Sequence, residues 1–377
     1  MTLSVRVWKC VFAAGMLAAS GSGVMAGPLA PPAGPIGSTY RTLGEVEPRI
    51  PVSAETTPGM AGEVYRIAQS GSYFLTGDIV VPSGKNGIVI AAAGVSLDMR
   101  GFTIRGEAGS LNGIADVDGA RQTHIFNGHF DGLGENGLWG NFAQNSIYQN
   151  LTAVNCGQKG MQLASGSVAE HCTARSCFEG ISTGHGVTLR NCSASANTFG
   201  GFALNEGSVA EDCTALNNAG VGIRVSSRSR VTNCTARGNT GDGFTATSAG
   251  MLEDCLSVGN GGNGFLVNVS SSSDANSVIR RCAAFQNSGA GIRSGGGRAL
   301  IDENVCRQNG TGILVQSAIG VPSLVIRNVC GGNTTVNYNI AASHRVGTIV
   351  QGALSGAING NTGGGLGTSD PWANFVD

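Results

Sequence analysis

One short unit recurs along the chain at intervals near 21 residues, and it constrains the fold more than any other feature of the sequence. Each unit has a small anchor residue, a second position five residues later, and in most units a glycine and an apolar residue after four more. The anchor column holds Cys172, Cys192, Cys213, Cys234, Cys255 and Cys282, then Asn304 and Asn328. The second column holds Cys177, Asn197, Asn218, Asn239, Asn260, Asn287, Asn309 and Asn333. Short β-branched runs separated by Gly and Asn corners at this period predict a β-solenoid in which each unit is one coil.

Stacked coils place like residues on like, so each column can be assigned a role. Stacked asparagines can hydrogen-bond along the column and to the backbone of the corner, and they tolerate left-handed dihedrals, so the asparagine column is predicted to be structural. Stacked cysteines lie about 4.8 Å apart with parallel side chains, which is too far for disulfides and too linear for a tetrahedral metal site. We therefore predict buried thiols and no metal site. Cys156 and Cys177 are the pair for which a disulfide remains the alternative.

The termini and the overall charge set the expected location. Residues 1–26 have the features of a signal peptide, with Arg6 and Lys9 before an apolar run and small residues ending at Ala26. That run is too short to span a membrane, so we expect a mature chain without an integral membrane segment, which is secreted to the periplasm, the cell surface or the medium. A net charge of −1 without a basic block argues against nucleic acid as a partner. We expect a monomer.

The predicted domains follow from composition and repeats. Residues 27–61 form a Pro/Gly-rich leader, residues 62–345 hold the repeats, and residues 346–377 form a Gly-rich C-terminal cap or tail. In the tail, Trp372 and Phe375 are expected to dock on the last coil, because an uncovered end of a solenoid invites association.

The repeats "VTLRNCSASANTFGGF" and "VTNCTARGNTGDGF", with the earlier "VSLDMRGFTIRG", resemble those of right-handed parallel β-helix proteins of the pectin-lyase-like group. The resemblance covers roughly residues 62–345. It implies an all-β fold, a right-handed parallel β-helix of about 21 residues per coil. It implies no single activity, because the group includes lyases, hydrolases, epimerases, binding proteins and adhesins.

The densest polar cluster lies in the early coils and supplies the candidate catalytic residues. His129, Asp131 and Glu135 surround one expected corner, and Trp139 follows on an outward strand position where its ring could stack on a sugar. Of the motifs that the resemblance implies for a hydrolase, only Gly-His-Gly is present, at residues 184–186. The alternative is that these are ordinary polar residues of irregular coils.

Arginines supply the other candidate binding residues. Arg224 and Arg293 share an outward column, and Arg228 lies near Arg224, so together with Trp139 they are candidates for binding an acidic polysaccharide. The alternative is solvated corner arginines. A further outward column nearly alternates in charge and predicts a surface ladder of ion pairs; it holds Glu170, Arg190, Glu211, Thr232, Glu253, Arg280 and Asp302.

The function predicted from these features is a secreted β-helix protein that presents a side face to an extracellular polysaccharide, without strong catalysis. One alternative is a polysaccharide lyase, glycoside hydrolase or epimerase that acts on an acidic polysaccharide. Another is a structural or adhesive rod. No cofactor is predicted, although a lyase would use Ca²⁺ to neutralise the acid group of its substrate.

Overall fold

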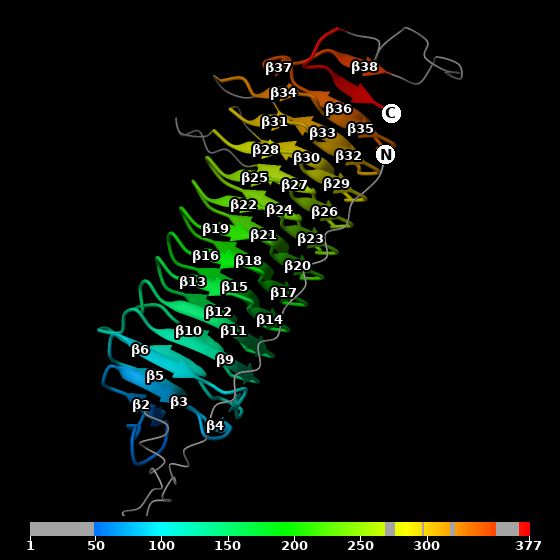
Figure 1. Ribbon diagram of the computed structural model, residues 1–377. Helices are drawn as coiled ribbons and strands as arrows, with labels where there is room; N and C mark the ends of the chain where they lie inside the picture. The colour runs from blue at the N-terminus through cyan, green and yellow to red at the C-terminus, as the bar shows by residue number, and fades with distance from the viewer. Residues whose placement is uncertain (1–48, 268–275, 296–297, 317–320, 352–368) are drawn as a thin grey trace, which may run out of the picture. The chain divides into compact units, whose positions relative to one another are not determined.

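The computed structural model describes residues 49–267, 276–295, 298–316, 321–351 and 369–377, so the expected signal peptide lies outside the described residues. Within them the chain forms strands and no helix, and all pairs of named strands are parallel (Figure 1). No segment of this described part is therefore a helix that could span a membrane. The result is an all-β solenoid, as the repeat predicted.

Each coil contributes three strands in turn. In one coil, β12 (Lys159–Leu163) is followed by β13 (Val168–Glu170) and β14 (Thr173–Arg175), and the next coil begins with β15 (Glu179–Thr183). Strand β12 pairs with β15, whereas β13 and β14 pair with β16 (Thr188–Arg190) and β17 (Ser193–Ser195). The structure therefore has one sheet built from the first strand of every coil, and one built from the second and third strands (Figure 1).

The first sheet has 13 strands, one per coil. Besides β12 and β15 it contains β2 (Glu63–Ile67), β5 (Asn86–Ile90), β8 (Ile114–Asp116), β10 (Leu138–Trp139), β18 (Gly200–Leu204), β21 (Val221–Val225), β24 (Phe244–Ala246), β27 (Phe265–Val267), β30 (Ala290–Ser294), β33 (Thr311–Val315) and β36 (Val336–Ile340).

The second sheet has 26 strands and bends where each coil turns between its second and third strands. In the early coils it contains β1 (Ile50–Pro51), β3 (Gly71–Phe74), β4 (Ile79–Val81), β6 (Val95–Asp98), β7 (Thr103–Gly106), β9 (His124–Asp131) and β11 (Ile147–Val154). The regular coils add β19 (Val209–Glu211), β20 (Thr214–Leu216), β22 (Arg230–Thr232), β23 (Thr235–Arg237), β25 (Met251–Glu253), β26 (Leu256–Val258), β28 (Val278–Arg280), β29 (Ala283–Phe285), β31 (Leu300–Asp302), β32 (Val305–Arg307), β34 (Leu324–Ile326) and β35 (Val329–Gly331). The last members are β37 (Arg345–Val346), β38 (Ile349–Gln351) and β39 (Asn374–Val376).

The anchor column of cysteines is a ladder of buried thiols, as predicted. The Sγ of Cys234 donates to the carbonyl oxygen of Ala210 in the preceding coil at 3.6 Å. Where Asn304 replaces cysteine, its Nδ2 donates to the corresponding carbonyl, that of Ile279, at 3.0 Å. All ten described cysteines are free and buried, Cys156 and Cys177 among them. A thiol thus occupies the place, and one of the hydrogen bonds, of a ladder asparagine.

The asparagine column is structural, but its geometry differs from the prediction. The left-handed residue at each corner is not the asparagine but the residue before it, such as Ala196 (φ 52°), Asn217 (φ 52°) or Gln286 (φ 54°). That residue turns the chain, so the following asparagine side chain lies inside the coil, where it is buried and hydrogen-bonded. The hydrogen bonds of its side-chain amide, and not a left-handed backbone, therefore explain why asparagine occupies this position.

Short segments at both ends join the second sheet. Strand β1, within the expected leader, pairs with β3, and β39, within the expected tail, pairs with β35 and β38. Asn374 of β39 is fully buried and extends the anchor column beyond Asn328, whose Nδ2 donates to its Oδ1 at 3.1 Å. Trp372 keeps 50% of its surface exposed but lies over Arg327, and Phe375 is partly buried on β39, so a buried asparagine docks the tail together with the two expected rings.

Candidate functional site

The three predicted catalytic residues are divided between a strand and a corner. His129 and Asp131 lie on β9 in the second sheet, and Glu135 lies in the corner that leads to β10. Asp131 contacts Arg105 (3.4 Å) and accepts a hydrogen bond from the Nδ2 of Asn155 (3.2 Å).

Glu135 accepts a hydrogen bond from the Nδ2 of Asn112 at 3.2 Å, and His129 is exposed. None of these contacts, in the part of the chain that is described, joins the three residues to one another. The described residues also contain no group of three or more His, Cys, Asp or Glu side chains that could hold a metal ion.

A fourth acidic residue of the early coils, Asp116, has a structural role. Its carboxylate is buried and accepts hydrogen bonds from the backbone N–H groups of Asn141, Phe142 and Ala143 in the next coil. Burial raises the pKa of Asp116, and these backbone donors oppose that rise. Because both carboxylate oxygens are engaged inside the solenoid, Asp116 holds a corner in place and does not face a ligand.

Three of the four predicted binding residues share one outward column of the first sheet. Trp139 on β10 is in register with Gln162, and the register leads coil by coil to Arg224 and then to Arg293. Arg228 lies outside this column, in the corner after β21, where its Nη1 contacts Glu206 at 2.7 Å. The first sheet therefore combines Trp139, Arg224 and Arg293 on a surface that His129 and Asp131 do not share.

An ion triad lies on the first sheet around Glu179, the first residue of β15. Its side chain is only 10% exposed, and its two carboxylate oxygens face Lys159 (3.9 Å) and Arg224 (3.6 Å). The carboxylate partner of Arg224 was missed at the sequence level, because Glu179 lies two coils earlier and in a different column. The Nζ of Lys159 also donates to Gln162 (2.5 Å) and Ser182 (3.2 Å).

Two stacked phenylalanines lie beside this triad, at the corners that precede β15 and β18. The rings of Phe178 and Phe199 are 5.1 Å apart and nearly parallel (7°), and each side chain is about half exposed, at 45% and 44%. The Arg224 guanidinium carbon lies 5.1 Å from the centre of the Phe199 ring. Sequence reasoning also missed this pair, although two phenylalanines one coil apart in a chain with 6% aromatic residues were a usable signal.

We call the surface formed by these residues the Phe–Arg patch. It comprises Lys159, Gln162, Phe178, Glu179, Ser182, Phe199 and Arg224. Flat exposed rings beside two partly exposed cations suit a ligand that has both an apolar face and polar edges. This patch is the candidate functional site.

The alternating charges of the second sheet form the predicted ladder in part. Arg190 contacts Glu170 at 3.4 Å and Glu211 at 3.1 Å, in the preceding and following coils. The pKa of Glu170 is lowered, mainly by the hydrogen bond from the Gln149 amide and then by the hydrogen bond and charge of Arg190.

Further along the column Arg280 contacts Asp302 at 3.3 Å, which gives a second stretch of paired charges. Glu253 contacts Arg230 and Arg281, which lie outside the column. Pairing within and beside the column is a sufficient structural reason for these charges.

Comparisons with known proteins agree with this architecture. The family model described as right handed beta helix region matches residues 178–277. Among solved structures, a periplasmic alginate epimerase double mutant matches with a TM-score of 0.50 and 11% identity, over 81% of this chain and 81% of that one. The A-module of a mannuronan C-5 epimerase from Azotobacter vinelandii matches with a TM-score of 0.48 and 18% identity, over 81% and 89% of the two chains. No curated protein matches the chain significantly by sequence. At these identities the structural likeness shows the fold alone.

Proposed function

We propose that this chain, a right-handed parallel β-helix protein with the pectin-lyase-like fold, binds a polysaccharide on its first sheet. The single observation that carries the proposal is the exposed Phe178–Phe199 stack beside Arg224. A folded protein gains little by leaving two parallel rings half exposed, whereas such rings form a ready surface for the C–H faces of sugars.

The polar part of the Phe–Arg patch offers two partly exposed cations, Lys159 (29%) and Arg224 (39%), as donors to the oxygen atoms of a sugar. Gln162 and Ser182 lie on neighbouring strands beneath these cations, where both are largely covered (8% exposed each) and accept hydrogen bonds from Lys159. A small number of well-placed polar groups next to an apolar surface is typical of ligand sites. The column of outward residues continues from this patch toward Trp139 in one direction and Arg293 in the other, so an extended chain could contact several coils.

The class of ligand has support from a protein of the same fold. The solved structure with a TM-score of 0.50 is an alginate epimerase of the periplasm, and alginate is a polysaccharide. We therefore propose a location outside the cytoplasm as well, which agrees with the expected signal peptide at residues 1–26.

A polysaccharide lyase, hydrolase or epimerase that uses the same surface is the second candidate. It is favoured by the Lys159–Glu179–Arg224 triad, which places a carboxylate and two cations beside an aromatic platform. Such a cluster could polarise a uronate carboxyl group or transfer a proton. Product formation from any polysaccharide, lost in a Glu179→Gln variant that still binds, would favour this candidate over binding alone.

The test is a binding panel of alginate, polygalacturonate and soluble cellulose derivatives, measured by affinity electrophoresis and calorimetry. The double variant Phe178→Ala/Phe199→Ala should weaken binding about tenfold, because each ring-stacking contact contributes roughly 0.5–1.5 kcal/mol. Phe142→Ala is the matched control, since Phe142 is also exposed (46%) but belongs to an earlier corner. Wild-type affinity in the double variant, or no binding of any of these polymers by the wild-type chain, would refute the proposal.

A further inference from the structure

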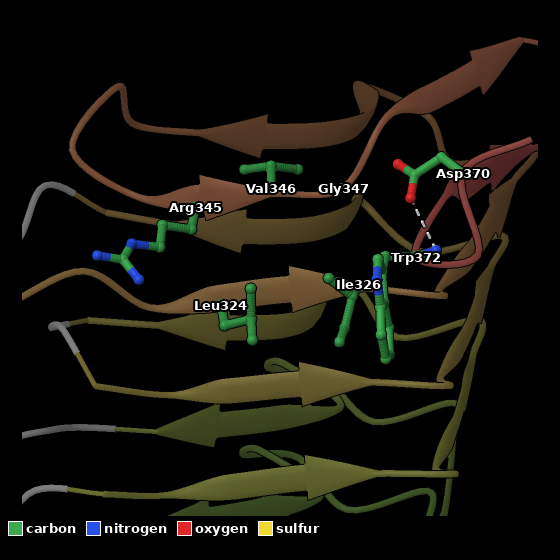
Figure 2. A pocket seen from close by; sticks show the side chains of 7 residues that line it. All are labelled: Leu324, Ile326, Arg345, Val346, Gly347, Asp370 and Trp372. Carbon is green, nitrogen blue, oxygen red and sulfur yellow. Dashed lines mark hydrogen bonds between the residues drawn. The ribbon is translucent and has the colours of Figure 1, made fainter.

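A pocket of about 330 Å³ lies on the second sheet where β34 and β37 meet the C-terminal segment. Figure 2 shows its lining, with Leu324 and Ile326 from β34 on one side of the opening and Val346 above them. Trp372 forms the aromatic wall next to Ile326, and Arg345, Gly347 and Asp370 complete the rim. This pocket is separate from the Phe–Arg patch, which lies on the first sheet around β12 to β21.

The Trp372 ring is exposed and yet held in place. Asp370 accepts a hydrogen bond from the backbone N–H of Trp372 at 2.9 Å (Figure 2) and from that of Thr348 at 3.2 Å. The backbone N–H of Arg327 donates to the Trp372 carbonyl at 3.2 Å, and the Arg327 guanidinium carbon lies 5.2 Å from the centre of the indole. A binding surface that is ordered before its ligand arrives loses less entropy on binding.

Arg327 is itself fixed. Its Nε donates to Asp302 at 2.8 Å, and its Nη1 lies 3.1 Å from Glu303. The guanidinium, whose side chain is 30% exposed, therefore lies against the ring at the surface and is already paired. Asn374 of the C-terminal segment is fully buried and hydrogen-bonded, whereas half of the Trp372 surface stays exposed.

We infer that this pocket binds one pyranose ring of a saccharide, stacked on Trp372. An indole face next to the aliphatic side chains of Leu324, Ile326 and Val346 matches the apolar C–H face of a sugar, and Arg345 at the rim offers donors to its hydroxyl oxygens. The volume is at the lower end of small-ligand sites, which suits a single ring better than a protein segment.

The inference rests on the proposed function for its class of ligand, and it adds a second, independent site. Two sites on different sheets would let one long polysaccharide, or two neighbouring chains, engage the same molecule. The second contact would then raise the avidity for polymers above that for short oligosaccharides.

The experiment uses tryptophan fluorescence in the full chain. The background Trp8→Phe/Trp139→Phe leaves Trp372 as the only tryptophan of the three. Titration with the hexasaccharides of alginate, cellulose and chitin should give a saturable change in emission with at least one of them. By calorimetry in the Phe178→Ala/Phe199→Ala background, Trp372→Ala should lower the affinity for that hexasaccharide by about tenfold, and Phe142→Ala should not.

The outcomes separate this inference from the proposed function. A Trp372 signal that survives in Phe178→Ala/Phe199→Ala supports the pocket even if the Phe–Arg patch proves inactive. No saturable emission change with any of the three hexasaccharides overturns the inference. So does an apolar dye that saturates the Trp372 signal and is not displaced by any of these sugars.

Discussion

The side-chain Nδ2 of Asn218 donates to the Oδ1 of Asn239 at 2.9 Å, and the backbone N–H of Asn218 donates to the same oxygen at 3.0 Å. The Nδ2 also donates to the carbonyl of Ala194 in the preceding coil at 3.1 Å. One buried side chain thus joins three coils. Repeated from Asn197 to Asn333, this relationship satisfies corner groups that water cannot reach.

Asn239→Ala should lower the free energy of unfolding by about 3 kcal/mol. The substitution leaves two donors of Asn218 and the carbonyl of Ala215 without partners, and each buried unsatisfied group costs roughly 1–3 kcal/mol. Urea unfolding measures the effect. Asn205→Ala, at an exposed position, is the control and should change stability by less than about 0.5 kcal/mol. A similar small effect for both variants would contradict the role of the ladder.

Cys282→Asn should be tolerated, with a change in stability within about 1 kcal/mol. The Sγ of Cys282 donates to the Leu252 carbonyl at 3.4 Å, and its backbone N–H already donates to Asn304 at 2.9 Å. An asparagine could make both contacts and extend the existing ladder by one rung. Cys282→Val keeps the volume but removes the donor, so it should be less stable than Cys282→Asn in the same urea titration. The opposite order would show that packing, and not hydrogen bonding, selects this residue.

Stability should decrease as the pH rises from about 7 to about 9.5. Burial raises the pKa of the Cys255 and Cys306 thiols, whereas in the unfolded chain a thiol ionises near about 8.5. The unfolded state then releases protons that the folded state keeps, so the stabilisation is complete below the unfolded pKa and declines above it.

Urea unfolding across this pH range is the measurement. The variant Cys255→Ser/Cys306→Ser carries fewer buried thiols and should show a weaker pH dependence. Stability that rises with pH over the same range would be inconsistent with neutral buried thiols.

Glu179→Gln should strengthen the binding of an anionic polysaccharide about fivefold at low salt. The carboxylate offsets one of the two positive charges of Lys159 and Arg224, and its removal leaves both cations uncompensated on the Phe–Arg patch. The gain should shrink at high salt because the added attraction is electrostatic. Affinity for a neutral cellulose derivative should not change, and it serves as the control. Weaker binding of both polymers would mean that Glu179 holds the patch together and does not mainly tune its charge.

Asn374→Ala should destabilise the C-terminal coils more than Trp372→Ala does. The Oδ1 of Asn374 accepts two hydrogen bonds from Asn328, and its Nδ2 donates to the carbonyls of Val325 (3.2 Å) and Gly347 (3.0 Å). The Trp372 ring is half exposed, so its replacement by alanine removes fewer packing contacts. Hydrogen exchange of β34, β35 and β39 would report the difference. Equal exchange in the two variants would imply that the ring, too, is part of the cap.

The solenoid could be predicted from the sequence because asparagine, cysteine, glycine and small apolar residues recur at fixed positions of each repeat, as stacked parallel coils require. The column that begins at Ala169 is in register as expected, and so is the outward column of Trp139, Arg224 and Arg293. In a stack of parallel coils each repeat contacts mainly its neighbours, so aligning the repeats in the sequence predicts which residues lie next to one another.

The Phe–Arg patch could not be predicted in the same way, because it depends on contacts between columns. Glu179 and Arg224 are two coils apart and occupy different repeat positions, so only the reach of a long arginine side chain brings them together. The pocket at Trp372 depends on the C-terminal segment, which carries no repeat and enters the second sheet out of the coil order, beside β35 and β38. Residues outside the repeat leave no periodic signal to align.

Asn374 also bears on how a chain of this kind can change length. It closes the anchor ladder with a rung of the same chemistry as those before it, and its own donors are satisfied within the chain. The closing segment docks on the asparagine rung of Asn328, and Asn304 presents the same group one coil before Asn328. Duplication or loss of a whole repeat in the gene would leave both ends intact. The number of coils, and with it the length of surface offered to a ligand, is thus open to selection independently of the fold.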